Sequence, residues 1–257
     1  MSERHSYPAG VPCWADVLVP DPSAVEEFYG DVFGWDFTDP TENGYRVARI
    51  RGLDVVGLGT ATQAMPSWNT YIRVESVEAA SERAVEDGGT LLVGPFDVLP
   101  AGRIAVIADP TQAVFAVWEA VDREGAQLIN EPGTWQMSSL HSNDPDAAAA
   151  FYGALFGWEA EPFGEGTLFR LPGYVGGRSR QPIPQDVVAV MAPRELRFPP
   201  SWVVNLQVSD VDLTVEVVTA QGGKAIAPPF DSSGFRNAVI QDPQGAVFAI
   251  SQLVIDH

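Results

Sequence analysis

Residues 28–35 read Phe-Tyr-Gly-Asp-Val-Phe-Gly-Trp, and residues 151–158 read Phe-Tyr-Gly-Ala-Leu-Phe-Gly-Trp. Six of the eight positions are identical, at an offset of 123 residues. Each copy has the pattern of an amphipathic helix that ends at a glycine, which can adopt the left-handed backbone conformation without a Cβ clash. A repeated helix end at this distance indicates a repeated module.

Further blocks recur in the same order along the chain. Residues 109–116, Asp-Pro-Thr-Gln-Ala-Val-Phe-Ala, match residues 242–249, Asp-Pro-Gln-Gly-Ala-Val-Phe-Ala, and smaller matches lie between these and the helix ends. One Gly/Arg/Pro-rich insertion near residues 173–186 accounts for most of the drift in offset. We therefore predict a first domain over residues 1–122, a linker over 123–134 and a second domain over 135–257.

The apolar periodicity predicts an α+β fold in which each domain repeats the order β-α-β-β-β twice. In the first half we expect strands over 11–19, 44–50, 54–59, 68–74, 90–93, 103–108 and 113–119, with helices around 25–32 and over 77–86. In the second half we expect strands over 135–141, 167–171, 187–191, 202–208, 224–226, 235–241 and 246–253, with helices over 147–156 and 213–221. Strands with one apolar and one mixed face are typical of a sheet that curves around a cavity.

The composition excludes several classes of protein. The net charge is −19 and Lys224 is the single lysine, so we expect no nucleic-acid partner. There is no run of eighteen apolar residues and no apolar signal core at the start, so we expect no membrane span and a cytoplasmic location. Cys13 is the single cysteine, which excludes an intrachain disulfide and a cysteine metal cluster.

These blocks resemble the vicinal oxygen chelate superfamily, which includes glyoxalase I, bleomycin-resistance proteins, extradiol dioxygenases and fosfomycin-resistance enzymes. The sequence is most similar to the two-module glyoxalase-like proteins of actinobacteria. The resemblance implies tandem βαβββ units whose sheets form half-barrels around a pocket. In metal-dependent members, His, Gln or Glu side chains enter that pocket, one from the first strand of a unit and one, a Glu, from the strand after the Asp-Pro turn.

The residues at those places are poor ligands for a divalent metal, which prefers imidazole or carboxylate. They are Trp14 and Met137 on the first strands, Asn69 and Val203 on the next, and Ala116 and Ala249 after the Asp-Pro turns. Glu119 and Gln252 alternate to the opposite face. Two of the three histidines, His5 and His257, belong to the chain ends. We therefore expect no metal and no cofactor.

Alternation along the strands predicts a pocket that mixes aromatic, apolar and polar side chains, as a small-molecule site requires. The candidate ligand-binding residues are Trp14, Asn69, Tyr71, Arg73, Trp118, Met137, Ser139, Asn205 and Gln207. The candidate catalytic residues are His141, whose imidazole titrates near neutrality, and Asp16. Each also has a structural interpretation: the aromatic residues fill the core, and Asp16 pairs with Arg73 or Arg103.

Three functions remain open on these grounds. The first is a metal-independent protein that binds a small organic molecule, such as a natural product or drug, for sequestration or resistance. The second is an enzyme, a glyoxalase-like lyase or isomerase or another metal-free acid–base catalyst. The third is a structural or regulatory protein whose cavity is filled by its own side chains. Four units in one chain are compatible with a monomer or a homodimer.

Overall fold

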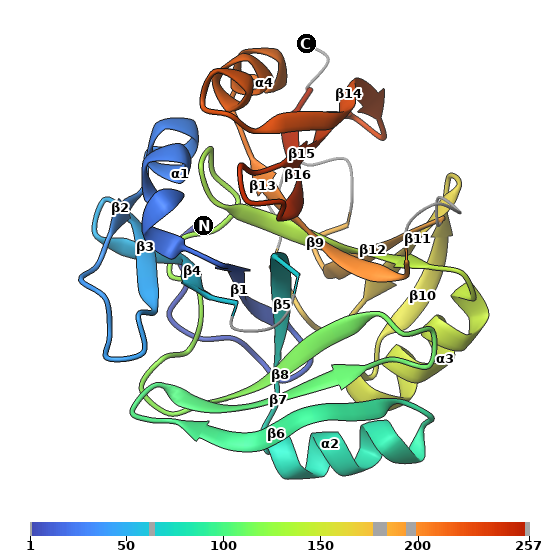
Figure 1. Cartoon of the computed structure of the whole chain (residues 1–257). Helices are drawn as coiled ribbons and strands as arrows, with labels where there is room; N and C mark the ends of the chain where they lie inside the picture. The colour runs from blue at the N-terminus through green and yellow to red at the C-terminus, as the bar shows by residue number, and fades with distance from the viewer. Residues whose placement is uncertain (1, 62–64, 177–183, 194–198, 255–257) are drawn as a thin grey trace.

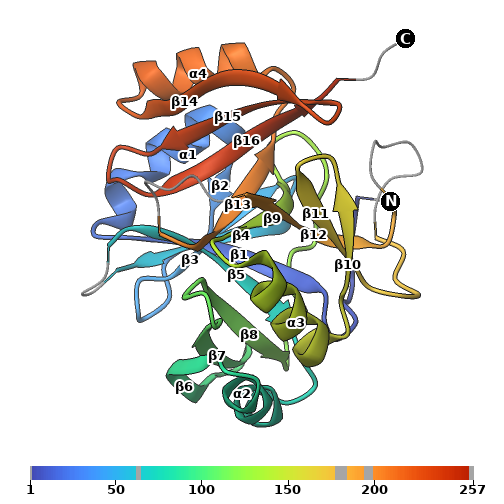
Figure 2. The ribbon, with the colours of Figure 1, turned by 90° about the vertical axis from the view of Figure 1, so that its right-hand side faces the viewer.

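The computed structural model describes residues 2–61, 65–176, 184–193 and 199–254. These residues form two eight-stranded mixed sheets and four α-helices, and each sheet joins two β-α-β-β-β units (Figure 1, Figure 2). The predicted α+β fold of two tandem modules is therefore confirmed. Neither sheet closes into a barrel, because each ends on two unpaired edge strands. No helix in the described parts of the chain has the length and apolarity needed to cross a bilayer.

The first sheet has the strand order β2-β3-β4-β1-β5-β8-β7-β6. Its strands are β1 (Pro12–Val19), β2 (Asp36–Phe37), β3 (Arg46–Ile50), β4 (Leu53–Thr60), β5 (Ser67–Arg73), β6 (Thr90–Val98), β7 (Gly102–Ala108) and β8 (Val114–Ala120). Its helices are α1 (Glu26–Phe33) and α2 (Val77–Glu86), and a short 3-10 turn, Pro22–Ala24, precedes α1. The two units meet where β1 runs antiparallel to β5.

The second sheet repeats this order as β10-β11-β12-β9-β13-β16-β15-β14. Its strands are β9 (Trp135–Ser142), β10 (Glu159–Phe163), β11 (Gly166–Arg170), β12 (Val187–Pro193), β13 (Ser201–Gln207), β14 (Lys224–Ser232), β15 (Phe235–Gln241) and β16 (Val247–Leu253). Its helices are α3 (Pro145–Phe156) and α4 (Val211–Ala220). Between β8 and β9 the chain is well packed, because Ala126 and Leu128 are buried and Leu128 forms a β-bridge with Glu3. The domain boundaries at 122 and 135 stay a prediction.

Four edge strands differ from the sequence expectation. The short strands β2 and β10 were not predicted, and β6 and β14 extend five and six residues beyond the predicted ends at 93 and 226. The added parts of β6 and β14 contain prolines, which are tolerated on an edge strand, where the missing N–H faces no neighbour. The repeated glycines end the helices as predicted, since Gly34 has φ 72° and Gly157 has φ 73°.

The two repeated sequence blocks meet across the modules rather than within them. The hydroxyl of Tyr29, on α1, donates a 2.8 Å hydrogen bond to Asp242 Oδ2, at the turn before β16. Symmetrically, the hydroxyl of Tyr152, on α3, donates a 2.9 Å bond to Asp109 Oδ2, at the turn before β8. Both tyrosines are fully buried. The first helix of each module, α1 or α3, thus anchors the turn before the last strand of the other, and α1 packs beside α4 while α2 packs beside α3 (Figure 1).

An aromatic cluster surrounds each crossed hydrogen bond. In the first, Tyr29 stacks on Trp35 at 5.4 Å between ring centroids and contacts Phe248 of the opposite module. In the second, Tyr152 stacks on Trp158 at 5.3 Å and contacts Phe115 of the opposite module. Such aromatic pairs add to the free energy gained from burial alone. The core therefore lies between the modules, and the remaining face of each sheet is left to form a cup.

We predict that Tyr152→Phe lowers the free energy of unfolding by about 2–3 kcal/mol, because Asp109 loses a buried donor and Trp202 Nε1 loses its 2.9 Å acceptor. Urea unfolding followed by tryptophan fluorescence measures the change. Tyr174→Phe removes a hydroxyl from a half-buried tyrosine and serves as the matched control, with a change within about 0.5 kcal/mol. Equal stability of the two variants would contradict an anchoring role for the crossed bond.

Candidate functional site

Residues paired across neighbouring strands project to the same face of a sheet, so the strand registers define the two cups. In the first sheet, Trp14 lies opposite Tyr71, which lies opposite Ala116. We call the face that carries these residues the first cup. In the second sheet, Met137 lies opposite Asn205, which lies opposite Ala249. We call that face the second cup.

The first cup is filled by its own side chains. Asp16, which is 1% exposed, accepts hydrogen bonds from the Tyr71 hydroxyl at 2.6 Å and from Asn69 Nδ2 at 2.8 Å. A third bond comes from the Tyr45 hydroxyl at 3.1 Å, and Tyr45 in turn accepts a 3.0 Å bond from Trp14 Nε1. The structure thus brings together four of the predicted residues, Asp16, Tyr71, Asn69 and Trp14. Their polar groups form hydrogen bonds with one another or with Tyr45 and are not left for a ligand.

The hydrogen-bond partners of the Asp16 carboxyl are uncharged side chains. Burial raises the pKa of this carboxyl above its usual range, and the hydrogen bonds from Tyr71, Asn69 and Tyr45 oppose that rise. The arginines suggested as its partners are engaged elsewhere: Arg103 forms ion pairs with acidic side chains near α2, and Arg73 lies 3.9 Å from Glu124. A catalytic role for Asp16 stays a prediction, and as arranged the carboxyl has no exposed route to a substrate.

Tyr45 seals the first cup because two glycines leave room for its ring. A Cβ built on Gly57 would overlap the Tyr45 hydroxyl and come within 2.9 Å of Asp16 Cβ. A Cβ built on Gly59 would lie 2.9 Å from Tyr45 Cδ2. Both distances are below normal carbon contact, so any larger residue at these positions would displace the tyrosine.

Two further contacts close the mouth of the first cup. The ring of Trp118 meets Tyr71 edge-on at 6.4 Å between centroids, which places this predicted ligand-binding residue in the packed interior. The guanidinium of Arg123 lies 5.3 Å from the Trp14 ring centroid and forms a 2.6 Å ion pair with Asp54. A cation thus already occupies the face of Trp14 that was expected to stack on a ligand.

The second cup lacks this seal. The register that pairs Asp16 with Gly57 in the first sheet pairs Ser139 with Val190 in the second. Arg46 lies opposite Leu58, and Thr167 lies correspondingly opposite Met191, so the residue before Thr167, Gly166, stands in the place of Tyr45. In the second module Gly166 therefore replaces Tyr45, Ser139 replaces its hydrogen-bond partner Asp16, and Val190 replaces Gly57, the glycine that leaves room for the tyrosine ring.

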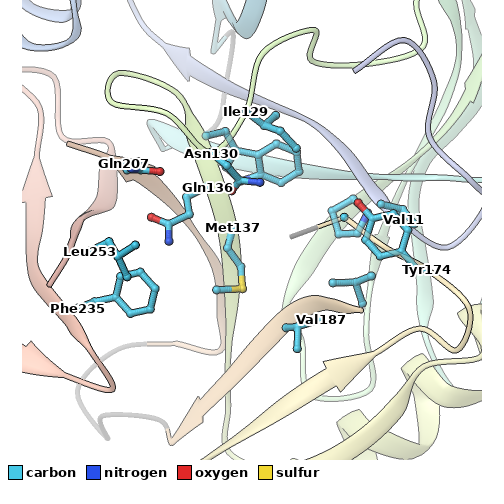
Figure 3. Close-up of a pocket in the computed structure, with 14 residues that line it drawn as sticks. Val11, Ile129, Asn130, Gln136, Met137, Tyr174, Val187, Gln207, Phe235 and Leu253 are labelled. Carbon is cyan, nitrogen blue, oxygen red and sulfur yellow. The ribbon is translucent and has the colours of Figure 1, made fainter. Parts of the chain in front are cut away.

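A pocket opens in the second cup (Figure 3). Its volume is about 80 Å³, below the roughly 300–1,000 Å³ typical of drug-sized ligand sites. The lining is mostly apolar with a few side-chain amides and carries no acidic, basic or histidine side chain among the residues described. The lining residues are Val11, Pro12, Ile129, Asn130, Trp135, Gln136, Met137, Tyr174, Gly176, Val187, Val188, Gln207, Phe235 and Leu253.

A β-bulge adds a polar group to this pocket. Leu206 lies opposite Trp135 and Asn205 lies opposite Met137, so Gln136 is an extra residue in β9. A bulge re-aims the local side chains, and Gln136 as well as Met137 lines the pocket (Figure 3). Its Oε1 is buried and accepts no hydrogen bond within the described chain. The same holds for Oδ1 of Asn205, the residue across from Met137.

The predicted residues of the second module lie on the expected face. Met137 and Gln207 line the pocket. Asn205 lies directly across from Met137, and Ser139 lies one alternation further along β9. His141 follows at the next alternation, half-buried and opposite Ser201. Predicting these positions required only the strand alternation and the repeat.

Several residues of both cups were not found from the sequence. Tyr45 precedes β3 in a turn, and its contact with Asp16 depends on the curvature of the sheet. Gln136 reaches the pocket through a bulge that alternation does not reveal. Phe235 and Leu253 lie opposite each other at the ends of β15 and β16 and form one wall of the pocket. A signal was present for Tyr45 alone: glycines at two alternate positions of one strand indicate the close approach of another group.

The donor set of neither cup suits the divalent metal of metal-dependent relatives. The registers bring Trp14, Tyr71 and Ala116 together in one cup, and Met137, Asn205 and Ala249 in the other, and none of these six side chains is an imidazole or a carboxylate. On β5 and β13 the residues paired with Trp14 and Met137 are Tyr71 and Asn205, two positions from Asn69 and Val203, and the ligand positions expected from the sequence stay a prediction. In the parts of the chain that the structure describes, no three His, Cys, Asp or Glu side chains gather into a possible metal site.

Comparison with protein families assigns both modules. Residues 13–139 match the glyoxalase/bleomycin resistance protein/dioxygenase superfamily, and residues 137–251 match the glyoxalase-like domain. A putative glyoxylase of Mycobacterium tuberculosis, CFP32, is 36% identical over 97% of this chain and 97% of its own. The chain belongs to the glyoxalase/bleomycin resistance protein/dioxygenase superfamily. The anthracycline biosynthesis protein DnrV of Streptomyces peucetius is 31% identical over 96% of this chain and 94% of its own.

Solved structures of low identity share the fold. The Mn(II)-bound glyoxalase from Novosphingobium aromaticivorans superposes with a TM-score of 0.64 at 17% identity, over 95% of this chain and 82% of that one. The 2,3-dioxygenase LapB from Pseudomonas sp. KL28 superposes with a TM-score of 0.66 at 12% identity, over 96% of this chain and 94% of that one. At these identities the likeness concerns the fold and carries no metal site over to this superfamily member.

We predict that Gly57→Ala destabilises the protein by about 1–3 kcal/mol, because the new methyl group overlaps the Tyr45 hydroxyl. In a Tyr45→Ala background the same substitution should cost less than half as much, because its main clash partner is gone. Gly30→Ala is the control: this glycine is helical, its nearest neighbour is at 3.4 Å, and alanine favours the helix. Equal costs of Gly57→Ala in both backgrounds, measured by urea unfolding, would contradict the seal.

Proposed function

We propose that this protein binds a small organic molecule in the second cup and does so without a metal ion. The observation that carries the proposal is the contrast between two cups built on one repeated scaffold. The first cup is sealed by Tyr45 and the second is open. Where the scaffold is duplicated, the demands of folding are similar, so the difference at the cups points to function.

The contrast extends over five corresponding positions of the two cups. In the first module they carry thiol, cationic, aromatic and aliphatic side chains, and in the second they carry four amides and a hydroxyl. The corresponding residues are Cys13 and Gln136, Tyr71 and Asn205, Arg73 and Gln207, Ile104 and Asn237, and Trp118 and Ser251. A few polar groups on an apolar lining orient and select a ligand, as small-molecule sites require.

The relatives support an organic ligand. DnrV and CFP32 are similar to this chain over nearly its full length, and their names refer to anthracycline biosynthesis and to a putative glyoxylase. Both names concern small organic molecules. Binding for sequestration or resistance requires shape and hydrogen bonding but no activated water, and it therefore agrees with a pocket whose described lining carries no imidazole, thiol or carboxylate. We further expect such a protein to act in the cytoplasm.

Native mass spectrometry of freshly purified protein, with metal analysis of the same sample, tests this proposal. We expect a co-purifying organic molecule and less than about 0.1 equivalent of manganese, iron, nickel or zinc, because no three His, Cys, Asp or Glu side chains gather in the described parts of the chain. Incubation with each metal followed by gel filtration should leave this ratio unchanged. One metal ion per chain, held through gel filtration and needed for binding, would overturn the proposal.

Acid–base catalysis is a second candidate function, as a lyase or isomerase. The observation in its favour is the position of His141, which follows Met137 and Ser139 on the face of β9 that forms the second cup. A histidine there can transfer protons to or from a bound molecule near neutral pH.

If His141 acts as a general base, His141→Ala should lower turnover of the co-purified molecule by at least about 100-fold and leave its affinity unchanged. Proton NMR follows turnover, and isothermal titration measures affinity. His5→Ala, at an exposed position near the N-terminus, is the matched control and should behave as wild type. Unchanged turnover in His141→Ala would reject this role, and no turnover in wild type would leave binding as the function.

A further inference from the structure

We propose that the second cup recognises a neutral molecule through hydrogen bonds that the molecule donates to Asn205 Oδ1 and Gln136 Oε1. The ligand class that follows is an uncharged compound with two hydroxyl or N–H groups on one edge and an apolar remainder. This inference rests on the proposed function and deepens it. A chelated metal binds ligand oxygens as electron donors, whereas these amide oxygens require the ligand to supply the hydrogens.

The two amide oxygens are buried acceptors without a donor. Six buried side-chain polar atoms lack a hydrogen-bond partner in the described chain. The two that belong to the second cup are both amide oxygens on neighbouring strands: Gln136 precedes Met137 in the chain, and Asn205 lies directly across from it. An unpaired buried acceptor costs free energy, so its retention calls for an explanation, and a donor supplied by a ligand is one.

In the first cup, hydroxyl groups of the protein itself donate hydrogen bonds to a buried side-chain oxygen. There the hydroxyls of Tyr45 and Tyr71 donate to a buried oxygen, Oδ2 of Asp16. In the second cup Gly166 stands in the place of Tyr45 and Asn205 in the place of Tyr71, so both hydroxyl donors are missing. The unpaired acceptors occur in the cup that lost the donors. Hydroxyl groups of a ligand would replace what the tyrosines provide in the first cup.

The lining of the pocket selects a neutral compound with an apolar body. Within the described residues no acidic, basic or histidine side chain lines it, so these residues offer a charged ligand no counter-charge to offset its desolvation. Met137 lines the pocket together with Gln136 and with the hydrophobic wall formed by Phe235 and Leu253 (Figure 3). A thioether adapts to an irregular or flat surface and makes favourable contacts with rings.

Resorcinol, 1,3-dihydroxybenzene, is the probe that matches these features, since its two hydroxyls are not adjacent and do not chelate a metal. Its dimethyl ether, 1,3-dimethoxybenzene, keeps the ring and the acceptors but loses both donors. Benzoate serves as a charged ring of similar size. The methyl NMR signal of ¹³C-labelled Met137, assigned with Met137→Leu, reports binding in the second cup. Met191, which is 3% exposed and does not line the pocket, is the internal control signal.

We expect resorcinol to shift the Met137 signal and to bind at least about 10-fold more tightly than its dimethyl ether, because each unmade hydrogen bond leaves an acceptor unpaired. Benzoate should not bind. Equal binding of the diol and the ether, or preference for benzoate, would overturn the inference and leave the proposed function standing. If no probe moved the Met137 signal and the purified protein carried no organic molecule, the proposed function would fall as well.

Two substitutions separate recognition from folding. Asn205→Leu and Gln136→Leu remove one acceptor each, and each should weaken resorcinol binding at least about 10-fold while bringing the affinities of diol and ether closer. Each should also raise the melting temperature of the ligand-free protein by about 2–4 °C, since an unpaired acceptor is replaced by an apolar group. Gln221→Leu, which removes an exposed amide bonded to Asp31, is the matched control for both measurements. A lower melting temperature with unchanged diol preference would show that the amides serve folding, and would overturn the inference.

Discussion

The crossed hydrogen bonds between tyrosine and aspartate fix the relation between the two modules. Each aspartate uses one carboxylate oxygen to hold its own turn, since Asp109 Oδ1 accepts from the backbone of Thr111 and Ala113. The other oxygen accepts from the tyrosine of the opposite module. A helix end and a turn that are far apart in sequence are therefore coupled in both directions. The repeat is a physical necessity of this arrangement, because each module supplies the partner that the other needs.

This coupling determines where variation is tolerated. The helices and the faces of β5 and β13 that carry Trp68 and Trp202 are committed to the core between the modules. The opposite faces of the sheets are not needed for that contact. Once the modules hold each other, one cup can be filled for stability and the other left open for binding. The chain makes this division, with a sealed first cup and a second cup that carries amides.

Most of the fold could be predicted from local sequence, and the site only in part. The blocks around Tyr29 and Tyr152 identify the repeat, and alternation places Met137, Asn205 and Gln207 on the correct face. Alternation cannot show that Tyr45 reaches across a curved sheet to Asp16, because that contact joins strands through space. It also fails at Gln136, where a bulge adds a residue to the count. The strands predicted over 90–93 and 224–226 were too short, because β6 and β14 are edge strands, which tolerate the prolines they contain.

The two cups are alternative solutions to one packing problem. A curved sheet of this size encloses a volume that must hold side chains, solvent or a ligand, because an empty apolar cavity is costly. In the first cup Tyr45 fills the volume, and the hydroxyl that enters with it satisfies the buried carboxylate of Asp16. In the second cup Gly166 leaves this volume open. The amide oxygens of Gln136 and Asn205 are unpaired there, which lowers the stability of the ligand-free protein. The residues that distinguish the second cup from the first are thus also the ones that make the second module less stable without a ligand. The proposed binding therefore depends on a difference between the halves of the chain, whereas the fold depends on their likeness.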